Sequence, residues 1–478
     1  MSSIRRVIAI SFADKYTTTL IYFISTVIIA RLLTPEEIGI YSVGAAVISI
    51  MHSLRDFGIT NYLVQEKELT EKRIQTAFTI TLIIGFTLGL IIFLLAKSVA
   101  NFYSEEGLYL VMTVIAFNFF LIPFGGIPLT LLRRNLNFKP LYWINLCSAL
   151  VHMLTSIILA ANGFGFMSLA WAALAGVVTT VIGSLIAAPQ YFVTRTSFSE
   201  YNRVLKTGGQ FSVISIFNSI GTSAPDMIIG RMLGFSELAF FNRALSFVQL
   251  VDRTLLKGLQ PVLLPYFAKQ NREKQNINTT YLLGIEIITG LTWPFLFLLA
   301  MMAAPLIHLL FGNQWGESVP LVQIICFAMA FRFINPLTQN ALFGGGHTYT
   351  VMIFTIALQC FKIIFIFIGC IYGLIGVAIA YTAGEILGMV VLAFIAKRKF
   401  HLAFKHLSFP VLRSGLLTLW CTIPSISIIR IFGLDETINT TSLIIMIFIS
   451  IFSFIFWLVG IYLFKHSIRY EINRVLKL

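Results

Sequence analysis

Charged side chains within apolar stretches are the residues of this chain most suited to chemistry. Eight are basic: Lys15, Arg55, Arg243, Arg253, Lys257, Arg332, Lys362 and Arg413. Six are acidic: Asp14, Asp56, Asp226, Asp252, Glu286 and Glu385. An ionised side chain at the centre of a bilayer costs about 2.5–3.5 kcal/mol on insertion scales. These groups must therefore line water or pair with one another, which predicts a hydrated cavity.

The segment 237–264 shows how such charges are arranged. Its polar face spans an arc of about 120° at helical spacing and contains Arg243, Gln249, Arg253, Lys257 and Gln260. Arg253 and Lys257 are four residues apart, and two like charges on one helix face are destabilising unless an anion or a carboxylate faces them. Two interpretations stay open, a structural ion pair and an anion-binding wall. The carboxylates available for pairing are Asp226, Glu286 and Glu385.

The predicted anion-binding residues are Arg55, Arg243, Arg253, Lys257, Arg332 and Lys362. The six acids above are candidates for ion coupling or charge pairing, and Asp14 is the one considered as a ligand of a coupling ion. The five cysteines have no metal-binding or redox spacing. We therefore expect no metal site and no cofactor other than a coupling ion, Na⁺ or H⁺.

Composition determines the broad class. The 478 residues are 58% hydrophobic and 11% charged, whereas a soluble domain has roughly 25% charged residues. The mean hydropathy is +0.88. These values predict an all-α integral membrane protein without a soluble domain. An enzyme is not expected, because no long loop and no loop with paired carboxylates is present to carry catalytic groups.

Apolar runs of about 20 residues predict about fourteen transmembrane helices. Their spans are 10–31, 38–61, 76–97, 108–132, 142–162, 168–190, 208–231, 237–264, 282–311, 319–343, 350–370, 375–397, 411–433 and 441–465. If both termini are cytoplasmic and basic residues at the helix ends are counted with the adjoining loops, the cytoplasmic segments contain 22 of the 34 Lys and Arg residues and the periplasmic loops contain four. This asymmetry follows the positive-inside rule. The net charge of +14 is therefore a sign of topology, and nucleic acid is excluded as a partner.

An internal repeat predicts the arrangement of the helices. Residues 28–42 align without gaps to residues 228–242, with five of fifteen positions identical. Each copy ends one predicted helix and begins the next, so the two halves have parallel topology. We predict two pseudo-symmetric six-helix lobes, 1–197 and 198–400, and two further helices with a cytoplasmic tail at 401–478. In the first copy, Thr34 and Glu37 predict a capping box around Pro35.

Four segments carry a family resemblance. They are ARLLTPEEIGIYSVG at 30–44, LRDFGITNYLVQEKELTEKRIQTAFTI at 54–80, Leu310-Phe311-Gly312 with Trp315 and Val319-Pro320-Leu321, and Asn335-Pro336 followed by Gly345. Over roughly residues 10–400 the chain resembles the polysaccharide transporters (Wzx-type, O-antigen and colanic acid exporter-like) of the multidrug/oligosaccharidyl-lipid/polysaccharide superfamily.

The resemblance implies a two-lobed bundle that works by alternating access in a bacterial cytoplasmic (inner) membrane. It implies flipping of a polyprenyl-pyrophosphate-linked oligosaccharide for surface polysaccharide synthesis, with the cavity cations holding the pyrophosphate. Membrane lipid and a polysaccharide polymerase or chain-length machinery are the further partners expected. Two alternatives remain, a cation-coupled multidrug exporter and a flippase of the lipid-linked peptidoglycan precursor.

Overall fold

The chain forms a helical membrane protein with two compact units. The computed structural model describes residues 2–56, 58–66, 68–193, 195–199, 201–252, 263, 266–267, 270–273, 277–400, 404–432, 440–470 and 473. Every regular element in these residues is helical. Contacts divide the chain into a first unit, Met1–Ala239, and a second unit, Phe240–Leu478. The predicted lobes rest on the repeat rather than on contacts, and their boundary stays a prediction.

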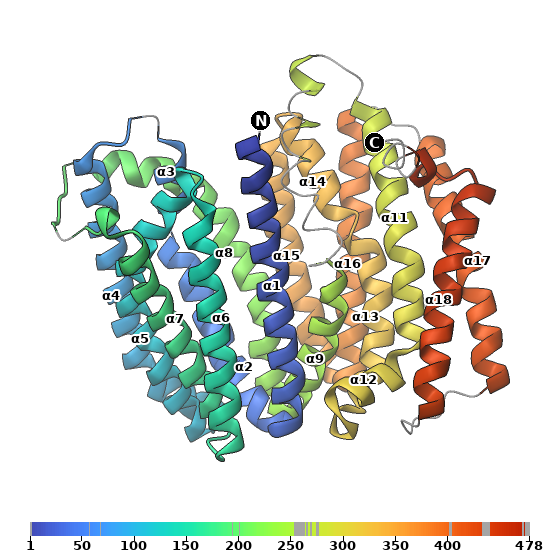
Figure 1. The fold of residues 1–478 in the computed structure, drawn as a ribbon, viewed down its shortest axis with the longest axis horizontal. Coiled ribbons are helices and arrows are strands. Elements are labelled where there is room, and N and C mark those ends of the chain that lie inside the picture. The colour runs from blue at the N-terminus through green and yellow to red at the C-terminus, as the bar shows by residue number, and fades with distance from the viewer. Residues whose placement is uncertain are drawn as a thin grey trace. The chain divides into compact units, whose positions relative to one another are not determined.

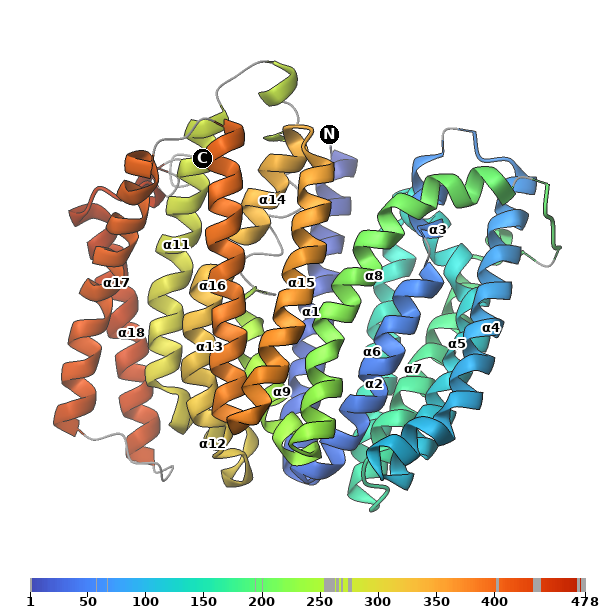
Figure 2. The same cartoon turned by 180° about the vertical axis from the view of Figure 1, so that it is seen from behind.

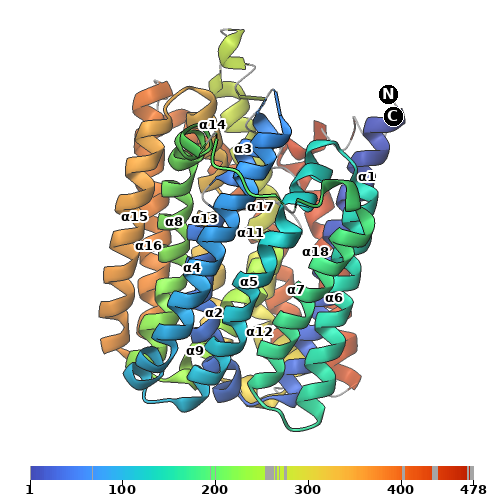
Figure 3. The same cartoon turned by 90° about the vertical axis from the view of Figure 1, so that its left-hand side faces the viewer.

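The first unit is a bundle of long helices (Figure 1). Its elements are α1 (Ser2–Leu32), α2 (Pro35–Asp56), α3 (Ile59–Gln65), α4 (Glu71–Tyr103), α5 (Glu106–Arg134), α6 (Phe138–Ala161), α7 (Met167–Ala187), the 3₁₀ turn Pro189–Tyr191, α8 (Tyr201–Met232) and the start of α9 (Phe235–Val251). Figure 3 shows α4, α5, α7 and α6 side by side, and α4 packs on α5 while α6 packs on α7. α1 lies against α6, and α8 lies against α2.

The two copies of the repeat end and begin their helices at the same aligned positions. α1 ends at Leu32 and α2 begins at Pro35, and α8 ends at Met232 and α9 begins at Phe235, which are the same positions in the alignment. The last backbone hydrogen bond of each first helix is 2.9 Å long, and the first of each second helix is 3.2 Å long. The structure therefore confirms that each copy joins two helices through a two-residue turn.

The predicted capping box is confirmed in the first copy. The backbone N–H of Thr34 donates to the carboxylate of Glu37 at 2.8 Å, and the backbone N–H of Glu37 donates to the hydroxyl of Thr34 at 3.3 Å. Two N–H groups that the helix leaves without partners are satisfied in this way. The second copy has Gly234 at the corresponding position, with a φ of 119°.

The second unit contains the remaining membrane helices (Figure 2). Its elements are the rest of α9, then α11 (Ile277–Met301), α12 (Ala303–Phe311), the 3₁₀ turn Asn313–Trp315, α13 (Ser318–Arg332), α14 (Asn335–Gly344), α15 (Thr348–Ile371), α16 (Gly373–Phe400), α17 (Phe404–Phe432) and α18 (Thr440–Leu463). α16 packs against both α13 and α15, and α17 packs against α11 and α18.

Three spans predicted as continuous helices are interrupted. The span 38–61 divides at Gly58, whose φ of 66° ends the helical path. The spans 282–311 and 319–343 divide after Met301 and Arg332. In both, a proline follows four residues later, and its missing N–H leaves that carbonyl without its helical partner. In the described residues, eleven helices are long and apolar enough to cross a membrane, and the count of fourteen stays a prediction.

Candidate functional site

The second unit brings buried charges together where one membrane helix is interrupted. α13 ends at Arg332 and α14 begins at Asn335, close to the middle of the span Ser318–Gly344. Pro336 explains the break, because it cannot donate a hydrogen bond to the carbonyl of Arg332. A helix C-terminus carries partial negative charge, which stabilises a cation such as Arg332 in the last turn.

Two cations share one oxygen of Glu385. The guanidinium Nη1 of Arg332 lies 2.9 Å from Oε1 of Glu385, and Nζ of Lys362 lies 2.8 Å from the same oxygen. Nη1 of Arg332 also donates to the hydroxyl of Tyr381 at 2.8 Å. The exposed fractions of the side chains differ sharply, at 1% for Glu385, 14% for Lys362 and 35% for Arg332. We name Arg332, Lys362, Tyr381 and Glu385 the charge cluster.

Small residues between α15 and α16 allow this contact. Gly369 and Gly376 bring the two backbones together, and a Cβ at Gly376 would lie 2.5 Å from the carbonyl oxygen of Gly369. A Cβ at Gly384 would lie 3.0 Å from Cγ of Lys362. Because Gly384 has no side chain, the ammonium of Lys362 reaches across to Glu385.

The charges around Arg332 come from the charge cluster and from Asp252. The three charged members of the charge cluster carry +1, +1 and −1, a net charge of +1. Asp252, at the end of the described part of α9, also acts electrostatically on Arg332. Arg332 has five N–H donors, and its hydrogen bonds to Tyr381 and Glu385 both use Nη1. An exposed guanidinium within a membrane span is costly in lipid, so a hydrated cavity around the exposed part of Arg332 stays a prediction.

The other predicted cations lie in different surroundings. Arg55 lies in the last turn of α2 and forms an ion pair with Asp56 at 2.5 Å, where Asp56 is exposed. Arg243 is buried in α9, with its guanidinium 4.7 Å from the ring of Phe311 and 4.4 Å from that of Trp315. The positions 253 and 257, both predicted to bind the anion, lie outside the described residues.

In the first unit, Asp14 begins a row of polar contacts between α1 and α6. Its Oδ2 accepts a hydrogen bond from Nδ2 of Asn145 at 2.9 Å. Further along, the rings of Tyr22 and His152 meet edge to face at 5.5 Å. Oδ1 of Asp14 is buried without a hydrogen-bond partner among the described residues. The paired residue numbers rise together, so the two helices run in parallel.

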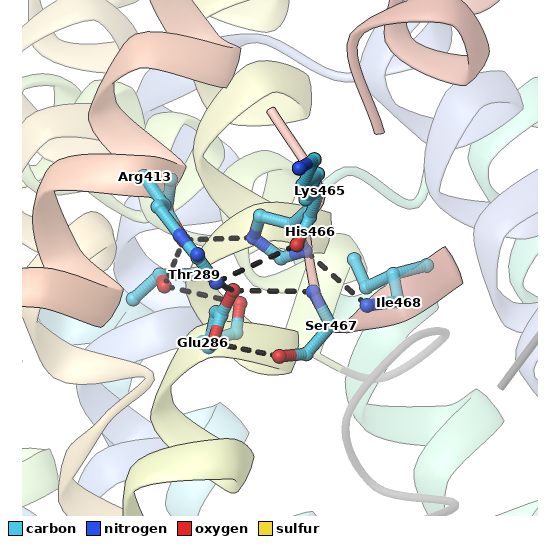
Figure 4. Close-up of polar contacts among 8 residues, drawn as sticks. Glu286, Thr289, Arg413, Lys465, His466, Ser467 and Ile468 are labelled. Carbon is cyan, nitrogen blue, oxygen red and sulfur yellow. Dashed lines mark hydrogen bonds and ion pairs between the residues drawn. The ribbon is translucent and has the colours of Figure 1, made fainter. Parts of the chain in front are cut away.

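Asp226 and Glu286 complete the predicted acids. Asp226 is partly buried in α8. Glu286 is buried in α11, where its Oε1 lies 3.5 Å from Nη1 of Arg413. The carboxylate of Glu286 also accepts from the backbone N–H of Ser467 at 3.1 Å and from its hydroxyl at 2.7 Å. Figure 4 shows Glu286 at the centre of these contacts.

The chain beyond α18 thus folds back onto α11 and α17. His466 is fully buried, and its ring takes the space that Gly290 leaves open, because a Cβ there would lie 2.3 Å from the ring. Nε2 of His466 lies 3.2 Å from the hydroxyl of Ser414, and Nδ1 accepts from the backbone N–H of Ile468 at 3.3 Å (Figure 4). We name Glu286, Arg413, Ser414, His466 and Ser467 the C-terminal clamp.

Sequence reasoning missed Tyr381, His466 and Ser467. Tyr381 precedes Glu385 by four residues and therefore shares its helix face, which is a signal that could have identified it. No local pattern marks His466 or Ser467, because their partners lie more than 50 residues away along the chain.

Comparison with known proteins places the chain in a family. The profile of a family described as polysaccharide biosynthesis protein matches residues 28–320. The chain is 26% identical over 335 residues to the succinoglycan biosynthesis transport protein ExoT of Rhizobium meliloti, a match covering 68% of this chain and 66% of that protein. It is 23% identical over 319 residues to the lipopolysaccharide biosynthesis protein WzxC of Escherichia coli, covering 65% and 64%.

Solved structures share the fold. The lipid II flippase MurJ, in an inward closed conformation, superposes with a TM-score of 0.77 at 14% identity, covering 96% of this chain and 99% of that one. An inward-facing multidrug resistance MATE family transporter of the MOP superfamily superposes with a TM-score of 0.66 at 16% identity, covering 82% and 98%. The family profile covers more than half of the chain, and the fold is that of MOP-superfamily transporters. The chain therefore belongs to the polysaccharide biosynthesis protein family, and its fold is that of multi-span membrane transporters.

Proposed function

We propose that this protein flips a polyprenyl-pyrophosphate-linked oligosaccharide from the cytoplasmic to the periplasmic leaflet of a bacterial inner membrane by alternating access. The observation that carries the proposal is the charge cluster, in which Arg332 is partly exposed beside a helix break near the middle of a candidate membrane span. A pyrophosphate leaving water needs strong N–H donors, and a guanidinium matches phosphate geometry.

The relatives support this class of substrate. ExoT and WzxC are named for the biosynthesis of succinoglycan and lipopolysaccharide. A teichuronic acid biosynthesis protein, TuaB of Bacillus subtilis, matches 61% of this chain at 23% identity. Several different glycans among the relatives agree with a site that recognises a shared pyrophosphate rather than one sugar. A polysaccharide polymerase would then receive the flipped unit as the next protein in the biosynthetic process.

A deletion strain tests the proposal. We expect lipid-linked oligosaccharide to accumulate on the cytoplasmic face and surface polysaccharide to fall, as measured by mass spectrometry of extracted lipids. Wild-type protein supplied from a plasmid should restore export, whereas Arg332→Gln at equal membrane abundance should not. Normal export without accumulation would refute the proposal. Accumulation of the lipid-linked peptidoglycan precursor would instead identify the other flippase activity.

We also propose that Asp14 takes up the coupling cation, H⁺ or Na⁺. Its carboxylate is held by Asn145 through one oxygen, and the other oxygen is buried without a partner in the described part of the chain. An unpartnered buried carboxylate oxygen is costly, and a bound cation would satisfy it.

A further inference from the structure

The charge cluster contains one more cation than its carboxylate needs. Burying a single ion pair is already costly, and removing one partner strands the other. Here Oε1 of Glu385 contacts both Arg332 and Lys362. If either cation left, Glu385 would still keep a partner within hydrogen-bond distance. The arrangement therefore lets one cation move without leaving a buried carboxylate uncompensated.

Exposure identifies the cation that can move. The side chain of Lys362 is 14% exposed, and Gly384 packs closely against it. The side chain of Arg332 is 35% exposed and stands at the last turn of α13, next to the break. The guanidinium of Arg332 has donors beyond those that contact Glu385 and Tyr381, so it can meet an incoming anion before it leaves the carboxylate.

We propose that, before substrate binds, the carboxylate of Glu385 occupies the position on Arg332 that a substrate phosphate takes later. When substrate binds, Arg332 exchanges Glu385 for a pyrophosphate oxygen, and Lys362 stays in contact with Glu385 and neutralises it. This inference rests on the proposed function and assigns separate roles within it. Arg332 binds the substrate, and Glu385 and Lys362 are positioning residues that set how tightly Arg332 holds it. Competition from Glu385 weakens binding enough for the substrate to leave.

Opposite effects on affinity test the exchange. The purified full-length chain in phosphatidylcholine nanodiscs is titrated with inorganic pyrophosphate at fixed ionic strength. Glu385→Gln removes the carboxylate that holds Arg332 in the charge cluster, so we expect the pyrophosphate Kd of this variant to fall about tenfold. Lys362→Met leaves Glu385 with Arg332 as its remaining cationic partner in the charge cluster, so we expect the Kd to rise about tenfold. Glu286→Gln makes the same chemical change in the C-terminal clamp and should leave the Kd unchanged.

The double variant Lys362→Met with Glu385→Gln separates exchange from direct contact by Lys362. Without Glu385 there is nothing for Arg332 to exchange, so the double variant should bind at least as tightly as wild type. If Lys362 contacted the phosphate itself, the double variant would bind clearly more weakly than Glu385→Gln alone, and the inference would be wrong. The double variant loses one positive and one negative charge, so it also serves where Glu385→Gln does not fold.

Arg332→Gln separates this inference from the proposed function. One outcome would overturn the exchange and leave the pyrophosphate site intact. In that outcome Arg332→Gln abolishes the binding seen in wild type, and Glu385→Gln leaves the Kd unchanged. Wild-type protein with no binding that depends on Arg332 would overturn both. In proteoliposomes carrying a polyprenyl-pyrophosphate-linked glycan, Glu385→Gln should lower both the turnover number and KM. Loss of folded protein would lower the total rate but would leave KM unchanged.

Discussion

At the scale of single residues, the buried imidazole of His466 makes hydrogen bonds that fit the neutral form of the ring. It lies beyond α18, and its Nδ1 accepts a hydrogen bond from the backbone of Ile468, which a protonated ring could not do. Burial lowers the pKa of His466 below its usual value, with Glu286 opposing this shift and Arg413 reinforcing it. The backbone carbonyl of Lys465 lies 3.5 Å from Nη1 of Arg413 (Figure 4).

Stability should therefore depend on pH through His466. The folded-state pKa is below the unfolded value of about 6.5, so the unfolded chain binds more protons between the two values. The stabilisation is present above about pH 6.5 and is lost as the pH falls below it. We expect the unfolding temperature to fall between pH 7.5 and pH 5. His466→Gln should have a lower unfolding temperature at pH 7.5 and a smaller drop at pH 5, and an equal drop in both proteins would contradict the assignment.

Arg332 and Arg243 are the same residue type in two different surroundings. Arg332 contacts a carboxylate and is partly exposed, whereas Arg243 is enclosed by the rings of Phe311 and Trp315. A stacked guanidinium gains cation–π stabilisation in a desolvated site. The surroundings of Arg243 therefore agree with a structural role, and those of Arg332 agree with the proposed binding of an anion.

At the scale of elements, the two repeated turns approach each other at Gly39. A Cβ at Gly39 would lie 1.9 Å from the carbonyl oxygen of Phe235, so only glycine lets α2 pass the start of α9 at this distance. Gly39→Ala should destabilise the protein by roughly 1–3 kcal/mol, because backbone must move. Thermal unfolding measures this loss. Gly126→Ala in α5 meets nothing within 4 Å and should be neutral, and equal effects would argue against a steric cause.

The α1–α6 contact makes a second prediction at this scale. If Asp14 takes up the coupling cation, Asp14→Asn should abolish the response of transport to an imposed H⁺ or Na⁺ gradient while pyrophosphate binding stays within about twofold of wild type. Proteoliposomes with each gradient imposed separately identify the ion. Glu36→Gln, which changes an exposed acid at the start of α2, is the control. A gradient response retained by Asp14→Asn would exclude this carboxylate.

At the scale of the whole molecule, charge distribution predicts the orientation in the membrane. With 22 Lys and Arg residues in the expected cytoplasmic segments and four in the periplasmic loops, both termini should be cytoplasmic. Reporter fusions at each end test this: a fluorescent protein should mature and an alkaline phosphatase should stay inactive. A terminus active as phosphatase would change the number of spans from even to odd.

Much of the fold follows from the sequence alone. Apolar length indicates membrane helices, since lipid forbids unpaired backbone. The repeat located two turns that the structure places at the same positions, and Thr34 and Glu37 identified a cap. These features depend on neighbours within a few residues, which is why sequence patterns determine them. The sequence contains the cause of the interruption after Arg332, because Pro336 lies four residues later, although the span 319–343 is predicted as continuous.

The tertiary structure alone decided which charges meet. The sequence named Arg332, Lys362 and Glu385 as membrane charges but left open whether they bind a ligand or pair. They lie on three different helices, and their contact depends on glycines that bring α15 and α16 together. The same holds for Glu286, whose partner Ser467 is 181 residues away. Helix composition is a local property that a sequence displays directly, whereas pairing between buried charges depends on helix packing and emerges only in the folded chain.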